Sequence, residues 1–218
     1  MTPFSTDRDL LLLEPELFGD LAFFAQLRVS VDDAELADTT LTSIDADFDT
    51  AQIDPGHVAL IDRQPCEVTQ RLDAMSLTVS LLRSTPTDPA IPPIPQGQNR
   101  TLRIRTFAPQ AVGVAHDLLR ALGIDPDEPN AVELGKPTAD SVLSLNLMAR
   151  LEALGTLHRL YAAASAVDER QDAFSEKAEH YRTAFRSAMA SASVLIDVNH
   201  DGLPEERRAF ASGRLLRA

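Results

Sequence analysis

The sequence TADSVLSLNLMARLEALGTLHRLYAAAS, residues 138–165, is followed by the joint AVDER, residues 166–170, and then by QDAFSEKAEHYRTAFRSAMASAS, residues 171–193. Both long stretches place apolar side chains at intervals of three and four residues, which is the period of one helix face. Neither stretch contains proline, and Gly155 is their only glycine. The short joint predicts a long antiparallel helix hairpin. Its apolar stripe is either buried within one subunit or partly turned toward an identical neighbour.

The sequence before this stretch has the pattern of short strands. Residues 22–83 are rich in β-branched and aromatic residues, and Asp-Pro-Gly at 54–56 marks a turn. Asp32 and Asp33 are expected to form the turn between the first two strands. Residues 84–99 contain five prolines and are expected to be an exposed loop, either a spacer or an arm that reaches a neighbour. Residues 100–107 alternate in polarity like a half-buried strand.

The order of these patterns predicts an α+β fold in two parts. Residues 1–107 are expected to form a β-rich domain, built as a small antiparallel barrel or sandwich and carrying the Pro-rich loop at 84–99. Residues 108–218 are expected to form an α-helical domain. It consists of a helix starting at Pro109, the long hairpin, and a C-terminal β-hairpin or arm.

Composition excludes several classes of protein. No apolar run approaches the ~18 residues of a membrane span, and Asp7 and Asp9 oppose a signal peptide. The single cysteine, Cys66, cannot form an internal disulfide, suits a reducing cytosol and is expected in the core. The net charge is −13, and residues 1–60 carry 13 acids against two arginines. Such a surface opposes tight binding of nucleic acid.

No pattern typical of catalysis is present. The sequence has no GxSxG, Walker A or GxGxxG motif, and no second thiol for a zinc site. The five histidines are far apart in sequence and show no metal-ligand spacing: His57, His116, His158, His180 and His200. The chain is therefore not expected to be an enzyme. The alternative hypothesis is a hydrolase of unknown type.

The sharpest local motif is DVNHDG. It places Asp197, Asn199 and Asp201 at positions 1, 3 and 5 of an EF-hand calcium loop, with glycine at position 6. Position 12 should be a bidentate glutamate and is Arg208, although Glu205 stands at position 9. Two interpretations of the motif remain, a local turn stabilised by Asx side chains and a weak Ca²⁺ site. The turn is favoured. No other cofactor is expected.

The C-terminal stretch PEERRAFASGRLLRA, residues 204–218, has four arginines against two acids. Its basic and apolar residues are expected to bridge to a neighbour's acidic surface or to a partner protein, unless the stretch pairs as a strand in its own subunit. The residues expected to make this contact are Arg207, Arg208, Phe210, Arg214, Leu215, Leu216 and Arg217.

The order of segments resembles that of the head-tail connector proteins of tailed bacteriophages, also called adaptor or head-completion proteins. The resemblance is a pattern spread over nearly the whole chain. It is carried by DRDLLLLEPELF at 7–18, DFDTAQIDPGHVALIDRQPCEVTQRLDAMSLTVSLLR at 47–83, FAPQAVGVAHDLLRALGI at 107–124 and IDVNHDGLPEERRAFASGRLLR at 196–217. The Pro-rich loop at 84–99 is not part of the pattern.

The resemblance implies a structural virion protein without catalytic residues. It implies a homo-oligomeric ring in the neck, commonly of twelve copies, that sits on the portal protein and meets a tail or stopper protein. DNA would pass through the ring without sequence-specific binding, and assembly would take place in the host cytoplasm, with no membrane involved. A function from another class is a cytosolic Ca²⁺-dependent binding module that uses Asp197, Asn199 and Asp201.

Overall fold

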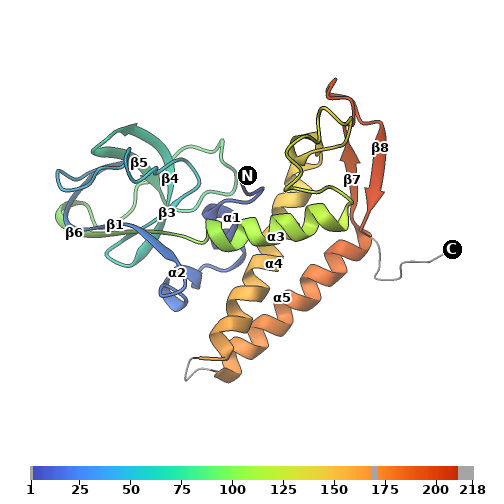
Figure 1. Ribbon diagram of the computed structural model, residues 1–218. Helices are drawn as coiled ribbons and strands as arrows, with labels where there is room; N and C mark the ends of the chain where they lie inside the picture. Colours follow the sequence, from blue (N-terminus) through green and yellow to red (C-terminus); the bar gives the residue numbers. More distant parts are fainter. Residues whose placement is uncertain (1, 168–170, 211–218) are drawn as a thin grey trace. The chain divides into compact units, whose positions relative to one another are not determined.

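The computed structural model describes residues 2–167 and 171–210 (Figure 1). The chain has an α+β fold that divides into two compact units, which are described separately. One unit is Thr6–Pro109, and the other combines Met1–Ser5 with Gln110–Ala218. The first is called the barrel unit below and the second the helical unit.

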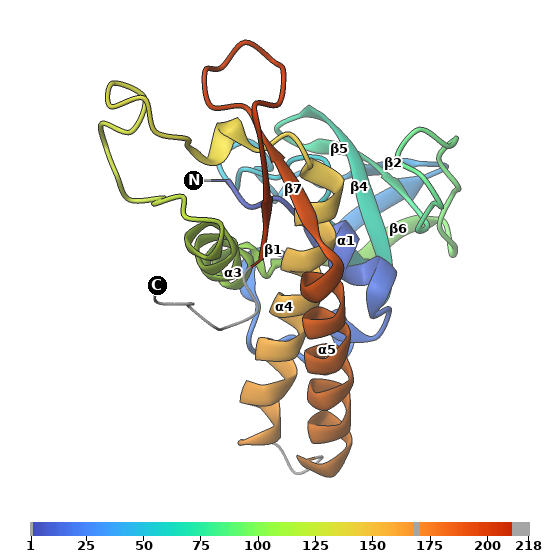
Figure 2. The same cartoon turned by 90° about the vertical axis from the view of Figure 1, so that its right-hand side faces the viewer.

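Six strands of the barrel unit form a closed antiparallel barrel in the order β1-β2-β5-β4-β3-β6 (Figures 1 and 2). The sequence allowed a barrel or a sandwich, and the structure shows the barrel. Closure pairs β1 with both β2 and β6, so the described sheet has no free edge. The strands are β1 Gln26–Ala37, β2 Thr40–Thr42, β3 Val58–Ile61, β4 Gln64–Asp73, β5 Ser76–Ser80 and β6 Gly97–Thr106.

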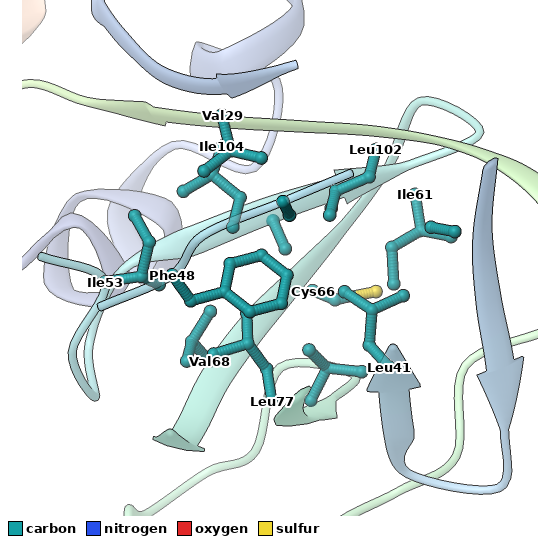
Figure 3. Packing of buried hydrophobic residues seen from close by; sticks show 14 of the residues in the cluster. Val29, Leu41, Phe48, Ile53, Ile61, Cys66, Val68, Leu77, Leu102 and Ile104 are labelled. Carbon is teal, nitrogen blue, oxygen red and sulfur yellow. The ribbon is translucent and has the colours of Figure 1, made fainter. Parts of the chain in front are cut away.

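The barrel interior is filled by alternating residues of the strands and by side chains from the β2–β3 connection, among them Phe48 and Ile53 (Figure 3). On β6, Leu102 and Ile104 are fully buried. Cys66 is also fully buried, which confirms the sequence-based expectation of a core residue. Burial raises the pKa of its thiol to about 12, so the thiol stays protonated and unreactive near neutral pH.

The expected turn at Asp32 and Asp33 is wrong. Strand β1 continues through both residues to Ala37, and the chain reverses at Asp38, whose φ is 55°. Asp32 forms an ion pair with Arg103 of β6, and Asp33 accepts a hydrogen bond from the Ser43 hydroxyl. These partners, one on β6 and one just after β2, hold the two acids in the strand, where the β1–β6 register is irregular.

Two short helices open the barrel unit, α1 Asp7–Leu13 and α2 Leu17–Asp20. Thr6 caps α1 in a capping box with Asp9, whose carboxylate accepts hydrogen bonds from the backbone N–H and the hydroxyl of Thr6. The Pro-rich connection between β5 and β6 is largely exposed. Its backbone is tied to β5 where Leu81 N–H donates to the Ile91 carbonyl.

The helical unit contains α3 Ala108–Ala121, the short 3₁₀ helix η1 Ala139–Ser141, α4 Leu145–Ser165 and α5 Gln171–Ser191. Helices α4 and α5 pack side by side (Figure 2). Tyr161 of α4 contacts the rings of Phe174 and Tyr181 on α5. The joint at 168–170 lies outside the described residues, so the hairpin arrangement stays a prediction.

The N-terminal residues of the chain belong to the helical unit. Glu152 of α4 is fully buried, and its carboxylate accepts hydrogen bonds from the backbone N–H groups of Phe4 and Ser5, both at 2.9 Å. The Ser5 hydroxyl donates to the same carboxylate. A buried acceptor inside the unit thus holds residues 4 and 5 in place, because leaving it without a hydrogen bond there would be costly.

The C-terminal strands β7 Ser193–Ile196 and β8 Glu206–Ala209 pair in antiparallel register, as the sequence predicted. Val194, Ile196 and Phe210 from this ribbon join a core with residues of α3 and α4. Val142, just after η1, forms an isolated bridge to Ile196. The ribbon is therefore an integral part of the helical unit.

Candidate functional site

The loop between β7 and β8, Asp197–Glu205, contains the DVNHDG motif and is called the acidic loop below. Asp197 is 5% exposed, and its carboxylate accepts the N–H groups of Asp201 and Gly202. The side chain of Asn199 accepts the Asp201 N–H, and Asp201 accepts the N–H of Leu203. The motif thus makes the turn expected from Asx side chains, with Gly202 at φ +88°.

The same loop brings three carboxylates together. Oxygens of Asp197, Asp201 and Glu205 all lie within 4.8 Å of one another, and the Glu205 carboxylate also accepts the Val198 N–H. Arg208, at the position where a calcium loop has its bidentate glutamate, donates to Glu206 and to the Leu122 carbonyl. Three one-oxygen ligands fall well short of the six to eight oxygens that Ca²⁺ takes.

The residues expected to form the C-terminal contact lie in different environments in the structure. Phe210 is 6% exposed and packs in the core of its own unit. Arg208 is held by Glu206 and Leu122 of the same chain. Arg207 is exposed on β8, where it remains available to a partner. Residues 206–209 therefore pair as a strand in their own subunit, which was the alternative considered for this stretch.

The other expected contact residues lie outside the described residues. They are Arg214, Leu215, Leu216 and Arg217, all within residues 211–218, which are called the C-terminal segment below.

A hollow in the helical unit is a stronger candidate for binding. It has a volume of about 760 Å³ and opens to solvent. Its lining comes from the N-terminal residues, from the connector between α3 and η1, and from the residues that lead into α4. This hollow, called the connector groove, is defined by Phe4, Asp125, Glu128, Asp140, Leu143 and Leu145.

The connector groove combines apolar and acidic side chains. Leu145 is 57% exposed at its wall, and Leu143, which also lines it, is 37% exposed. Glu128 pairs with Lys136 at 3.3 Å. Asp125 and Asp140 have no ion-pair partner among residues 2–167 and 171–210. The groove therefore suits a ligand with apolar side chains and positive charge.

A smaller hollow of about 280 Å³ in the barrel unit lies beside a buried Arg–Glu–Arg cluster. Both oxygens of the fully buried Glu67 carboxylate are bound, one by Arg8 Nε and the other by Arg83 Nε, each at 2.5 Å. Arg8 also donates to the Arg83 carbonyl, and Arg83 to the Asp88 carbonyl. The cluster ties α1 and the chain after β5 to strand β4.

Neither hollow is lined by a histidine. The acidic loop is the one group of three potential metal ligands in the described part of the chain. Neither of these two hollows therefore brings a histidine together with carboxylates, which is the arrangement expected under the hydrolase hypothesis.

Sequence reasoning missed the connector groove and the Glu67 cluster. The groove joins Phe4 to residues more than 120 positions later, and Arg8 is separated from Glu67 by 59 positions. Neither separation leaves a periodic signal in the sequence. The sequence does show one glutamate, Glu152, within the mostly apolar stretch 151–157. Its position there could have identified it as a candidate for a buried polar residue.

Comparison with family models, with curated proteins and with solved structures finds no match. No helix among the described residues is long and apolar enough to cross a membrane. A functional assignment therefore depends on the pattern of the sequence and on the geometry above.

Proposed function

We propose that this chain is a structural subunit in the neck of a tailed bacteriophage. In this role, copies of it form an adaptor ring that joins the portal at the head vertex to the tail and lets DNA pass. The ring has about twelve copies, as the resemblance implies, and each chain presents the α4–α5 pair as an antiparallel hairpin. The chain binds its partners without catalysing a reaction.

The observation that carries this proposal is the connector groove. Large apolar side chains stand exposed in its lining at Leu143 and Leu145. Exposed apolar surface of this kind, rimmed by polar groups, is typical of a protein interaction site. A subunit whose surfaces bind other proteins fits a structural ring.

The charge of the chain also supports the proposal. A net charge of −13 disfavours tight binding of phosphates, so DNA can slide past such a subunit without being held. Many acidic proteins share this property, so it supports the role only alongside the groove.

The decisive experiment uses heads that carry a portal but lack neck proteins. We expect the purified chain to bind such heads as a ring, to permit tail attachment and to keep the packaged DNA inside. Electron microscopy and nuclease sensitivity of the DNA give the readouts. A chain that leaves portal-bearing heads unchanged overturns the proposal. Portal, terminase or tail genes beside its own gene would identify the heads to use.

The acidic loop favours a second candidate, a Ca²⁺-dependent binding module. The observation behind it is the approach of the Asp197, Asp201 and Glu205 carboxylates to within 4.8 Å. Calorimetry with millimolar Ca²⁺ tests it, and Asp197→Asn is the informative variant because an amide oxygen still accepts the Gly202 N–H. Heat and a thermal shift in the parent that the variant loses would support the module. No heat and no shift in the parent removes it.

A further inference from the structure

The ribbon β7–β8 determines where the C-terminal segment leaves the helical unit. Ile196 pairs with Glu206 at one end of the ribbon, and Ser193 pairs with Ala209 at the other. Val142, which also lines the connector groove, bridges to Ile196. The groove therefore lies at the Ile196 end, and the chain leaves the ribbon at the Ser193 end, about 10 Å away along the strand.

This geometry favours a groove on another molecule over the chain's own. To enter its own groove, the C-terminal segment must reverse direction after Phe210 and run back along the ribbon. Phe210 is anchored in the core, so the reversal cannot be relieved by moving β8. A groove on a second copy imposes no such reversal, and eight extended residues reach about 26 Å.

The composition of the segment matches the groove. Leu215 and Leu216 stand between two arginines, Arg214 and Arg217, and the segment has no acidic side chain. The groove offers apolar walls at Phe4, Leu143 and Leu145, with exposed carboxylates at Asp125 and Asp140 that pair with no cation in the described part of the chain. Its volume of about 760 Å³ is within the ~300–1,000 Å³ of ordinary ligand sites, so it accepts a few side chains rather than a domain.

We propose that residues 211–218 of one copy dock in the connector groove of a second copy. The leucines cover the apolar walls, and the arginines face Asp125 and Asp140. The contact is small, so it is weak in solution and gains strength where copies are already held side by side. The inference rests on the proposed function in one respect only, which is that both require copies of the chain to meet.

The experiment measures self-association of the full-length chain by sedimentation up to about 1 mM. The groove variant is Asp125→Lys with Asp140→Lys, and the tail variant is Arg214→Glu with Arg217→Glu. Each is expected to lower the association constant about tenfold, because two attractive pairs become repulsive. Asp45→Lys on the barrel unit changes the charge of an exposed residue outside this contact and is expected to leave association unchanged.

Mixing the two variants supplies the stricter test. The reversed tail of one chain then meets the reversed groove of the other, and each unaltered tail meets an unaltered groove, so association returns to the level of the parent. All substituted groove and control residues are exposed, and thermal denaturation verifies that the variants fold. A second pair of variants, Leu145→Asp and Leu216→Asp, tests the apolar part and is expected to lower association about tenfold or more.

Three results overturn the inference: a parent chain that stays monomeric at the highest concentration, variants that associate as the parent does, or a mixture that is no stronger than its components. The outcome for the neck assignment is read separately on portal-bearing heads. A chain that self-associates as expected but ignores those heads refutes the assignment and leaves this inference standing. A chain that joins heads without self-association refutes this inference and leaves the neck assignment standing.

Discussion

Folding clearly alters the ionisation of Asp7. Burial raises the pKa of its carboxyl from 3.8 to about 6, although a hydrogen bond from the Phe107 N–H at 2.8 Å and the charges of His57 and Arg28 act in the opposite direction. Between these two values the folded chain keeps a proton on Asp7 that the unfolded chain has released. The stabilising contribution is therefore full below about pH 3.8 and is lost as pH rises through 6.

Asp7→Asn is expected to remove this pH dependence. The amide oxygen can still accept the Phe107 N–H, and the side chain no longer ionises. The variant should match the parent at pH 4 and exceed its free energy of unfolding at pH 7.5 by up to about 3 kcal/mol. Urea denaturation at both pH values measures the difference, with the exposed Asp45→Asn as control. Parallel pH profiles of parent and variant would contradict the assignment.

Glu67 provides a second prediction at the scale of single residues. Glu67→Gln removes the charge that two buried arginines share, so the free energy of unfolding is expected to fall by about 3–5 kcal/mol. The matched control is Asp32→Asn, which breaks the exposed pair with Arg103 and should cost under about 1 kcal/mol. Chemical denaturation compares the two. Equal losses in the free energy of unfolding would show that burial does not make the Glu67 cluster more stabilising than an exposed ion pair.

Helix α4 is closely packed at Gly155 within the helical unit. A Cβ at Gly155 would lie 2.7 Å from Val114 Cγ1 of α3 and 3.3 Å from the Phe185 ring of α5. Glycine in mid-helix is ordinarily unfavourable by about 1 kcal/mol relative to alanine. Here its missing side chain allows three helices to approach one another.

Gly155→Ala is therefore expected to destabilise the helical unit by about 1–3 kcal/mol, despite the better helix propensity of alanine. Gly113→Ala in α3 is the control, because its Cβ would meet only the Arg159 Nη1 at 3.5 Å. That variant should be as stable as the parent or up to about 1 kcal/mol more stable. Thermal denaturation followed by circular dichroism reads both. A stabilising Gly155→Ala would show that the packing adjusts.

For the whole molecule, charge and the C-terminal segment together determine assembly. Residues 1–60 carry most of the net charge of −13, so copies repel one another over a Debye length of ~8 Å at physiological ionic strength. The isolated chain is therefore expected to be monomeric at micromolar concentration and to form rings on a portal template.

Truncation separates assembly from folding. Ending the chain after Phe210 leaves every described residue in place, so stability should change by less than about 0.5 kcal/mol while self-association and joining to portal-bearing heads are lost. Ending it after Glu205 removes β8 and the buried Phe210, and should unfold the helical unit. Denaturation and sedimentation of both truncations test this. A chain ending at Phe210 that still joins heads would show that residues 211–218 are dispensable for docking.

Local patterns were enough to predict the individual elements. The helices α4 and α5 and the strands β7 and β8 follow from spacing within a few residues, where periodicity and turn chemistry act. The failure at Asp32 and Asp33 has a long-range cause, because Arg103 lies 71 positions away from Asp32. Turn propensity read from neighbours cannot include such a partner.

The candidate sites also differ in whether near neighbours in the sequence or distant residues form them. The acidic loop was predictable because the hydrogen bonds made by its side chains join residues at most seven positions apart. The connector groove was not, because Phe4, Asp125 and Leu145 meet only after α3, η1 and α4 have packed. Phe210 looked like a contact residue in sequence, and its burial depends on that same packing.

The sequence by itself determined the α+β class, the helical stretches, the strand-turn-strand ending and the acidic charge of this protein, because each depends on composition or on near neighbours. Only the tertiary structure decided between barrel and sandwich, placed residues 2–5 with the helical unit and formed the groove. These features depend on which distant side chains are buried together. That choice follows from the free energy of the whole packed chain, to which local preference makes a small contribution.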